Sequence, residues 1–147
     1  MHIKEFLSPS NVMIGLRARD KGALLRELSG RAAAALNLSA EAVEDAIEKR
    51  DQLGSTGIGK GVSMPHARLR EVEKPFGLLA RLKHPIDFQA IDEQPVDIVF
   101  LLLLPASSQM DQLNALAAVA RKLRDPAVLR RLRDAADLTA FYAAVVT

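Results

Sequence analysis

The chain has 147 residues, of which 49% are hydrophobic and 26% charged, and its formal net charge is only +2. This length fits one domain with an ordinary buried core, and the small net charge disfavours a nucleic-acid binder that relies on phosphate neutralisation. Because the chain has no cysteine, disulfides, thiolate chemistry and zinc–cysteine sites are excluded.

In the first half of the chain, hydrophobic periodicity predicts one strand and two helices. A brief turn near residues 3–7 leads into a short strand over residues 11–16. Asp20 can cap a helix that runs to about residue 36, and Ser39 can cap a second helix that ends near Arg50. A glycine-rich segment and a short extended run, residues 62–65, follow.

In the second half, two strands precede three helices. The pattern predicts a strand over residues 76–82, a polar connection containing His84 and Pro85, and a nearly all-apolar strand over residues 96–104 that suits the centre of a sheet. The first helix, residues 109–123, is expected to bury Leu113, Leu116, Ala117, Ala120 and Leu123. Asp125 and Pro126 begin the second. Asp137 caps the last, which is expected to pack Leu138, Phe141 and Val145.

Strands and helices are mixed along the whole chain with no evident linker or internal repeat, which predicts a single α/β domain over residues 1–147. We expect a small mixed sheet with helices on both faces. The longest apolar run, residues 98–106, is far shorter than the roughly 20 residues that cross a bilayer, and the first ten residues lack a signal-peptide core. We therefore expect a cytoplasmic protein with no membrane insertion.

The most informative segment, residues 54–61, holds four of the chain's eight glycines and lies just before Pro65 and His66. Glycines permit positive φ angles, and their amides can form a nest for an anion. A neutral imidazole is a good nucleophile near pH 7, and a transferred phosphoryl group adds about 1.5 to 2 negative charges. With donors from Ser55, Thr56, Ser63 and Arg68 nearby, His66 is a candidate phosphoryl acceptor.

Other interpretations of these residues are open from spacing alone. The glycine-rich segment nearly fits a phosphate-binding P-loop, but Gly61 replaces the Mg²⁺-binding hydroxyl and a helix precedes the loop, where a strand is required. Ser55 or Ser63 could form a hydrolase triad with His66, although no nucleophile elbow is present. His66 could also be an ordinary turn residue after proline. His84 is interpreted as a surface residue.

Residues 50–68, RDQLGSTGIGKGVSMPHAR, closely resemble the signature of the fructose/mannitol-type enzyme IIA domain of the bacterial phosphoenolpyruvate-dependent phosphotransferase system. Residues 91–97, IDEQPVD, followed by the apolar strand, resemble its nitrogen-regulatory branch. The resemblance extends over essentially the whole chain. It implies a mixed β-sheet flanked by helices, of the phosphotransferase/anion-transport-protein type.

The resemblance also implies a phosphotransferase activity with no bound cofactor and no metal. His66 holds the position of the family's phosphohistidine, which takes its phosphoryl group on Nε2, the tele position, from a small histidine phosphocarrier of the HPr or NPr kind. Arg50 matches an arginine near that site, and Ser55 and Thr56 match a Ser-Thr pair that helps to line it. The output is expected to be regulation of target proteins, of the nitrogen or potassium type, or else transfer to a separate IIB protein in sugar uptake.

Two positions depart from the family pattern. Asp51 replaces the usual glutamate, which is a mild change. Many members carry a second histidine against the phosphorylated one, and here that position is Gln112, with no histidine after His84. Glutamine can form hydrogen bonds with imidazole or phosphate but cannot carry a positive charge. We therefore expect His66 to act more as a phosphate-reporting switch than as a rapid relay.

Overall fold

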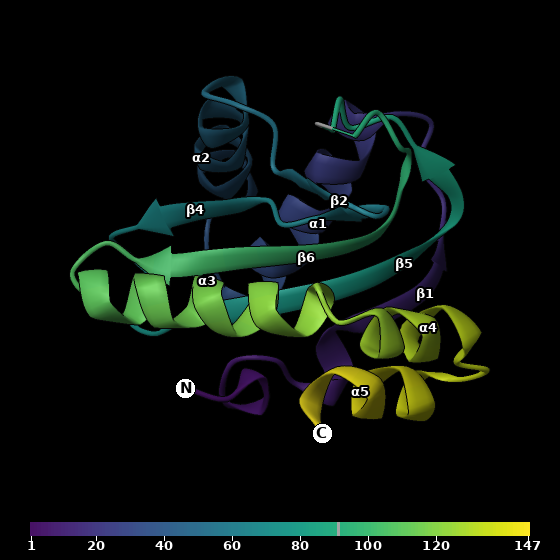
Figure 1. Ribbon diagram of the computed structural model, residues 1–147. Coiled ribbons are helices and arrows are strands. Elements are labelled where there is room, and N and C mark those ends of the chain that lie inside the picture. Colours follow the sequence, from purple (N-terminus) through teal and green to yellow (C-terminus); the bar gives the residue numbers. More distant parts are fainter. Residues whose placement is uncertain (91) are drawn as a thin grey trace.

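The computed structural model describes residues 1–90 and 92–147 (Figure 1). Ile91, which opens the second segment that carries the resemblance, lies outside the described residues. In chain order the elements are the 3₁₀ turns η1 (Ile3–Glu5) and η2 (Pro9–Asn11), β1 (Val12–Leu16), α1 (Lys21–Leu36), α2 (Ala40–Gln52), β2 (Gly57–Gly59), β3 (Val62–Ser63), β4 (His66–Leu69), β5 (Phe76–Ile86), β6 (Val96–Pro105), α3 (Gln109–Leu123), α4 (Pro126–Asp134) and α5 (Leu138–Val146).

The strands of the described residues form one mixed, six-stranded sheet in the order β1-β5-β6-β3-β2, with β4 also paired to β6. β6 is antiparallel to β5 on one side. On its other side β3 and β4 follow one another, both parallel to β6, with Val62 opposite Ile98 and His66 opposite Leu102. β3 and β4 therefore lie along the same side of β6 in the same register, like one strand with a gap. Met64 and Pro65 form the gap, and His66 is the first residue of β4.

Successive side chains of β6 point to opposite faces of the sheet. Phe100 and Leu102 pack in the core formed with α3, α4 and α5, whereas Leu101 and Leu103 pack in the core formed with α1 and α2. Figure 1 shows these two groups of helices on opposite faces of the sheet. The predicted α/β class, the central buried strand and the helices on both faces are confirmed.

The predicted helix starts are also confirmed. The carboxylates of Asp20 and Asp137 each accept a hydrogen bond from a first-turn amide at 2.8 Å, and Ser39 accepts one at 3.2 Å. Asp125 caps α4, which has Pro126 in its first turn. No helix among the described residues combines the length and apolar character needed to span a bilayer.

One predicted boundary is wrong. β5 continues to Ile86, past the expected end at residue 82, and so includes His84 and Pro85. Its pairing with β6 is irregular between Arg81 and Ile86. Proline is tolerated at such a place because its missing N–H is not needed by the ladder of hydrogen bonds. His84 is exposed, as predicted.

The predicted inward faces of α3 and α5 are partly wrong. Leu113 is 65% exposed and Leu138 is 49% exposed, and Ala117 is also exposed. The buried face of α3 instead consists of Gln112, Ala115, Ala118, Val119 and Leu123. The apolar residues of α3 are spread around more than one face, so that packing against β6 decides which of them are buried. The helix is thus turned about its axis relative to the prediction, so that Leu113 lies on the surface and Gln112 is buried.

Candidate active site

The backbone around His66 is held by the sheet. Pro65 precedes the histidine, and its carbonyl oxygen accepts a hydrogen bond from the amide of Leu102 at 2.9 Å. His66 then begins β4, opposite Leu102 in the register with β6. Because Pro65 is buried and His66 is half-buried, the imidazole starts from a rigid part of the structure and reaches a partly open surface.

The ring of His66 has a defined hydrogen-bond partner. Its Nδ1 atom lies 2.8 Å from the carbonyl oxygen of Met64. A carbonyl oxygen only accepts hydrogen bonds, so in the neutral ring Nδ1 carries the proton and Nε2 keeps its lone pair. The nucleophilic atom of His66 is therefore Nε2.

Burial lowers the pKa of His66 below its ordinary value, and the nearby cations Arg50 and Arg68 lower it further. The hydrogen bond to Met64 acts in the opposite direction, because the carbonyl oxygen also stabilises the protonated ring, but the net shift is downward. An unperturbed imidazole has a pKa of about 6.5. His66 is consequently mostly neutral at pH 7, and the neutral ring is the form that acts as a nucleophile.

A cleft of about 450 Å³ opens beside the imidazole. Its lining residues come from α2 and its C-terminal turn, β4, β6 and α3, and they include both basic and apolar side chains. The lining residues are Ala46, Lys49, Arg50, Leu53, His66, Ala67, Arg68, Leu104, Gln112 and Leu116. Among these described lining residues there are three cations and no carboxylate, so the cleft suits an anionic group.

Arg50 and Gln112, both predicted from the sequence, line this cleft together with His66. The Nη1 atom of Arg50 donates a hydrogen bond to the carbonyl oxygen of Gly54 at 3.1 Å, which holds the guanidinium near the end of α2. Gln112 is buried, and its Nε2 atom donates to the carbonyl oxygen of Pro105 at 2.9 Å. The structure thus brings together residues that lie 62 positions apart, from 50 to 112, around one imidazole.

Ser55 and Thr56, also predicted as site residues, have hydroxyl groups that are bonded elsewhere. Ser55 Oγ donates to the carbonyl oxygen of Phe88 at 2.9 Å. Thr56 is 5% exposed, and its Oγ1 atom lies 3.1 Å from Oγ of Ser63. Neither residue is among those that line the cleft.

The glycine-rich segment forms a hairpin instead of the expected anion nest at His66. Gly59, Lys60 and Gly61 all have positive φ, of 93°, 58° and 79°, and they make the tight turn between β2 and β3. A Cβ atom on Gly61 would lie 2.7 Å from Arg133, so this turn packs closely against α4. No glycine is among the described residues that line the cleft, where Lys49, Arg50 and Arg68 offer side-chain donors.

Sequence reasoning missed Lys49 and the apolar lining residues. Ala46, Lys49, Arg50 and Leu53 follow the helical spacing i, i+3, i+4 and i+7, and so they share one side of α2 and its C-terminal turn. In the sequence, that spacing from Arg50 predicts that Ala46, Lys49 and Leu53 lie on the same side of the helix as Arg50. Nothing comparable in the sequence marks Leu104 or Leu116, because each belongs to a longer apolar pattern.

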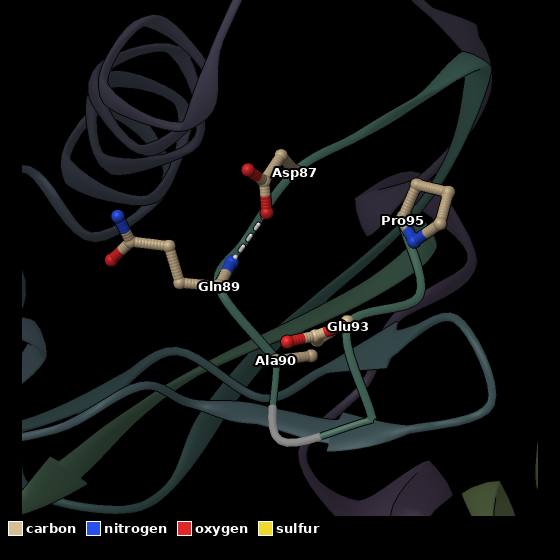
Figure 2. A pocket seen from close by; sticks show the side chains of 5 residues that line it. All are labelled: Asp87, Gln89, Ala90, Glu93 and Pro95. Atoms are coloured by element: carbon tan, nitrogen blue, oxygen red, sulfur yellow. Dashed lines mark hydrogen bonds between the residues drawn. The ribbon is translucent and has the colours of Figure 1, made fainter.

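A second hollow lies in the connection between β5 and β6 (Figure 2). It has a volume of about 460 Å³ and is lined by Asp87, Gln89, Ala90, Glu93 and Pro95. The carboxylate of Asp87 accepts a hydrogen bond from the amide of Gln89 at 2.8 Å. Its described lining offers two carboxylates and no nucleophilic nitrogen, and it shares no residue with the cleft at His66.

Comparison with known proteins finds similar chains and a similar fold. A nitrogen regulatory protein of Bradyrhizobium diazoefficiens is 42% identical over 142 residues, which cover 97% of this chain and 93% of that relative. A nitrogen regulatory protein of Escherichia coli is 41% identical over 82% of this chain and 74% of the relative. The crystal structure of nitrogen regulatory protein IIA-Ntr from Neisseria meningitidis matches with a TM-score of 0.92 at 29% identity, covering 97% of this chain and 98% of that one.

IIA mannitol from Escherichia coli shares the fold, with a TM-score of 0.77 at 17% identity over 94% of this chain and 97% of that one. Residues 5–146 match the family described as "Phosphoenolpyruvate-dependent sugar phosphotransferase system, EIIA 2", and the chain belongs to that family. The resemblance seen in the sequence is confirmed, including its nitrogen-regulatory character. Membership implies phosphoryl transfer between proteins.

Proposed function

We propose that Nε2 of His66 accepts a phosphoryl group from a histidine phosphocarrier of the HPr or NPr kind. The observation that carries this proposal is the 2.8 Å contact between Nδ1 of His66 and the Met64 carbonyl, which leaves the lone pair on Nε2. Nε2 attacks the phosphorus of the carrier's phosphohistidine, the carrier's N–P bond breaks, and its nitrogen takes back the electron pair. The proton on Nδ1 of His66 stays in place throughout.

The cations of the cleft support the transfer by electrostatics. Arg50, Arg68 and Lys49 line the same cleft as the imidazole and offset the charge of the incoming group. Gln112 adds a polar side chain without a charge. Catalysis of this kind depends on positioning and on preorganised charge, which is why no cofactor is required.

An apolar rim beside the cleft supports docking of a protein partner. Leu53, which lines the cleft, is 84% exposed. Met110 and Leu113 are exposed on α3, and Leu113 is three residues before the lining residue Leu116, on the same side of the helix. We propose that these exposed apolar side chains form part of a protein-binding surface, since contiguous exposed apolar patches are typical of such surfaces. We refer to Leu53, Met110 and Leu113 as the docking rim.

We propose that the output is regulation, as the names of the nitrogen regulatory relatives suggest. A phosphoryl group on His66 adds charge next to the docking rim, and that charge opposes the binding of partners that cover the rim with apolar side chains. Phosphorylation then decides which target proteins bind. The uncharged Gln112 in the cleft is consistent with a phosphohistidine that persists.

A second output is transfer to a IIB protein. A fructose-specific EIIA component of Haloferax volcanii is 37% identical over 65% of this chain, and this likeness favours a role in sugar uptake. The two outputs separate in one experiment: the phosphorylated protein is mixed with a purified fructose-type IIB protein. Movement of the label to IIB supports the relay, and retention of the label supports the regulatory switch.

The test of phosphoryl acceptance uses phosphoenolpyruvate, enzyme I and the carrier, with intact mass as the readout. We expect a gain of one phosphoryl group that is labile in acid and stable in base. His66→Ala should abolish the gain, whereas His84→Ala, which changes an exposed histidine of β5, should keep it. Label on the His66→Ala protein, or none on the unmodified protein, contradicts the proposal.

A further inference from the structure

Two buried hydroxyl groups lie behind His66, outside the cleft. Ser63 is 0% exposed and Thr56 is 5% exposed, and their hydroxyl oxygens are 3.1 Å apart. Burying a hydroxyl group without a partner is costly, so these two satisfy one another in an otherwise apolar region. Their bond ties the start of the hairpin to β3, one residue before Met64.

Met64 connects this hydroxyl pair to the imidazole. Its amide donates to the carbonyl oxygen of Thr56 at 2.9 Å, and its own carbonyl oxygen accepts from Nδ1 of His66 at 2.8 Å. Thr56 therefore holds Ser63 with its side chain and Met64 with its backbone. The hairpin at Thr56 is thus bonded directly to the residue whose carbonyl orients the histidine.

The other side of Met64 is equally restrained. Pro65 limits the residue before it to extended conformations, and the Pro65 carbonyl is held by the Leu102 amide at 2.9 Å. With the backbone fixed after Met64, the direction of its carbonyl depends on the support before it. That support comes from Thr56 and Ser63.

We infer that Thr56 and Ser63 are positioning residues that aim the Met64 carbonyl at Nδ1 of His66 and thereby keep the lone pair on Nε2. When this support is lost, the carbonyl moves away from Nδ1 and the proton spreads between the two ring nitrogens. A ring with the proton on Nε2 presents no lone pair at that atom. The change of tautomer is a property of the unphosphorylated protein and does not depend on the proposed function. The consequence for phosphoryl uptake does rest on the proposed function.

The primary test is ¹⁵N NMR of the His66 ring at a pH where it is neutral. Thr56→Val and Ser63→Ala each remove one hydroxyl, and Thr56→Ser keeps it. We expect a single Nδ1–H tautomer in the unmodified protein and in Thr56→Ser, and a mixture in the other two. Ser29→Ala is the matched control, because Ser29 is a fully buried serine of α1 whose Oγ has no hydrogen-bond partner among the described residues, and it should leave the tautomer unchanged.

The second readout is the rate of phosphoryl uptake from phosphoramidate, a small donor that needs no docking surface. Thr56→Val and Ser63→Ala should slow it roughly two- to tenfold, the range for one lost hydrogen bond. The double variant should be no slower than the worse single variant, because both changes remove the same bond. Ser63→Ala is the smaller change and keeps the test possible if Thr56→Val does not fold.

Folded variants with an unmixed Nδ1–H tautomer would overturn this inference, even if the unmodified protein takes up phosphoryl groups normally. The opposite result, mixed tautomers in the variants but no uptake by the unmodified protein, would contradict the proposed function and leave the positioning role intact. Mixed tautomers in Ser29→Ala would also overturn the positioning role of Thr56 and Ser63, since the loss of any buried hydroxyl would then have the same effect.

Discussion

The Nδ1 atom of His66 lies 2.8 Å from the carbonyl oxygen of Met64, a residue of the same chain segment. This contact spans only two residues, yet it decides which ring nitrogen is a nucleophile. The carbonyl belongs to a peptide group held by the hairpin on one side and by β6 on the other. A backbone carbonyl, not a neighbouring side chain, therefore fixes the tautomer of the imidazole.

The pH response of His66 follows from its environment. Burial and the two arginines lower its pKa, so we expect an NMR titration to give a value below the ordinary 6.5 or so. Uptake from phosphoramidate should stay constant as the pH falls through that ordinary value, and should decline only near the lower pKa. The urea-unfolded chain serves as the control, and an equal or higher pKa in the folded protein would refute this prediction.

The same shift predicts a pH dependence of stability. The unfolded chain binds a proton on His66 more readily than the folded protein does, so stability rises with pH over this range. The free energy of unfolding should therefore fall as the pH drops through about 6.5 towards the folded pKa. Urea unfolding of the protein and of His66→Gln measures this directly. His66→Gln should show a weaker pH dependence of the free energy of unfolding. Identical pH profiles for both proteins would contradict this prediction.

Arg50 and Arg68 should contribute to phosphoryl uptake through their charge. We expect Arg50→Gln and Arg68→Gln to lower the rate of uptake from phosphoramidate on the order of 10-fold, and each to raise the pKa of His66, because a nearby cation is removed. Arg31→Gln is the control, since Arg31 lies on α1 and contacts Glu27 at 3.4 Å. Unchanged rates in both cleft variants would show that these cations play no part.

The docking rim should affect the carrier but not the chemistry. Leu53→Ser and Leu113→Ser replace exposed leucines with a small side chain that carries no charge, and we expect the KM for the phosphorylated carrier to rise roughly tenfold, as loss of one buried leucine contact allows. Uptake from phosphoramidate should not change, because neither variant alters the charge of the cleft. Leu138→Ser alters a leucine that is 49% exposed on α5, away from the cleft, and should leave both values as they are. If all three variants have the same KM for the carrier, the docking rim is not part of the carrier-binding surface.

Arg81 should stabilise the C-terminal end of α4. Its Nη1 atom donates to the carbonyl oxygens of Leu132, Arg133 and Ala135 at 2.8 to 3.2 Å, and its guanidinium lies over the ring of Phe141. Arg81→Ala should lower the free energy of unfolding by about 1–3 kcal/mol, since it leaves several carbonyls without a donor. Arg31→Ala should cost less than about 0.5 kcal/mol, as is usual for exposed ion pairs. Urea unfolding of both variants provides the comparison.

Much of the fold was predictable because its signals are local. Asp20, Ser39 and Asp137 cap helices through bonds to residues only three positions away, and the apolar strand that became β6 is a continuous run. The end of β5 was not predictable, because Pro85 is tolerated only through an irregular pairing with β6. The exposed side of α3 likewise depends on which of several apolar stripes the sheet accepts.

The site was predictable only in part, for a related reason. The spacing of Pro65, His66 and the glycine-rich segment suggested that glycine amides hold the phosphoryl group. The hairpin instead takes up Gly57, Gly59 and Gly61, and Gly61 packs against Arg133, whereas none of the three lines the cleft at the imidazole. Closeness in sequence was misleading there, whereas Gln112, far away in sequence, lines the cleft. Only the resemblance to the family could bring Gln112 to the site in advance.

The most direct test of the phosphoryl acceptor locates the phosphorus on the ring. The protein is labelled with ¹⁵N in its histidines, phosphorylated through the carrier, and examined for ³¹P–¹⁵N coupling and ring shifts at His66. We predict phosphorus on Nε2 of His66, with a proton still on Nδ1. Phosphorus on Nδ1, on another residue, or on no histidine at all would contradict the assignment.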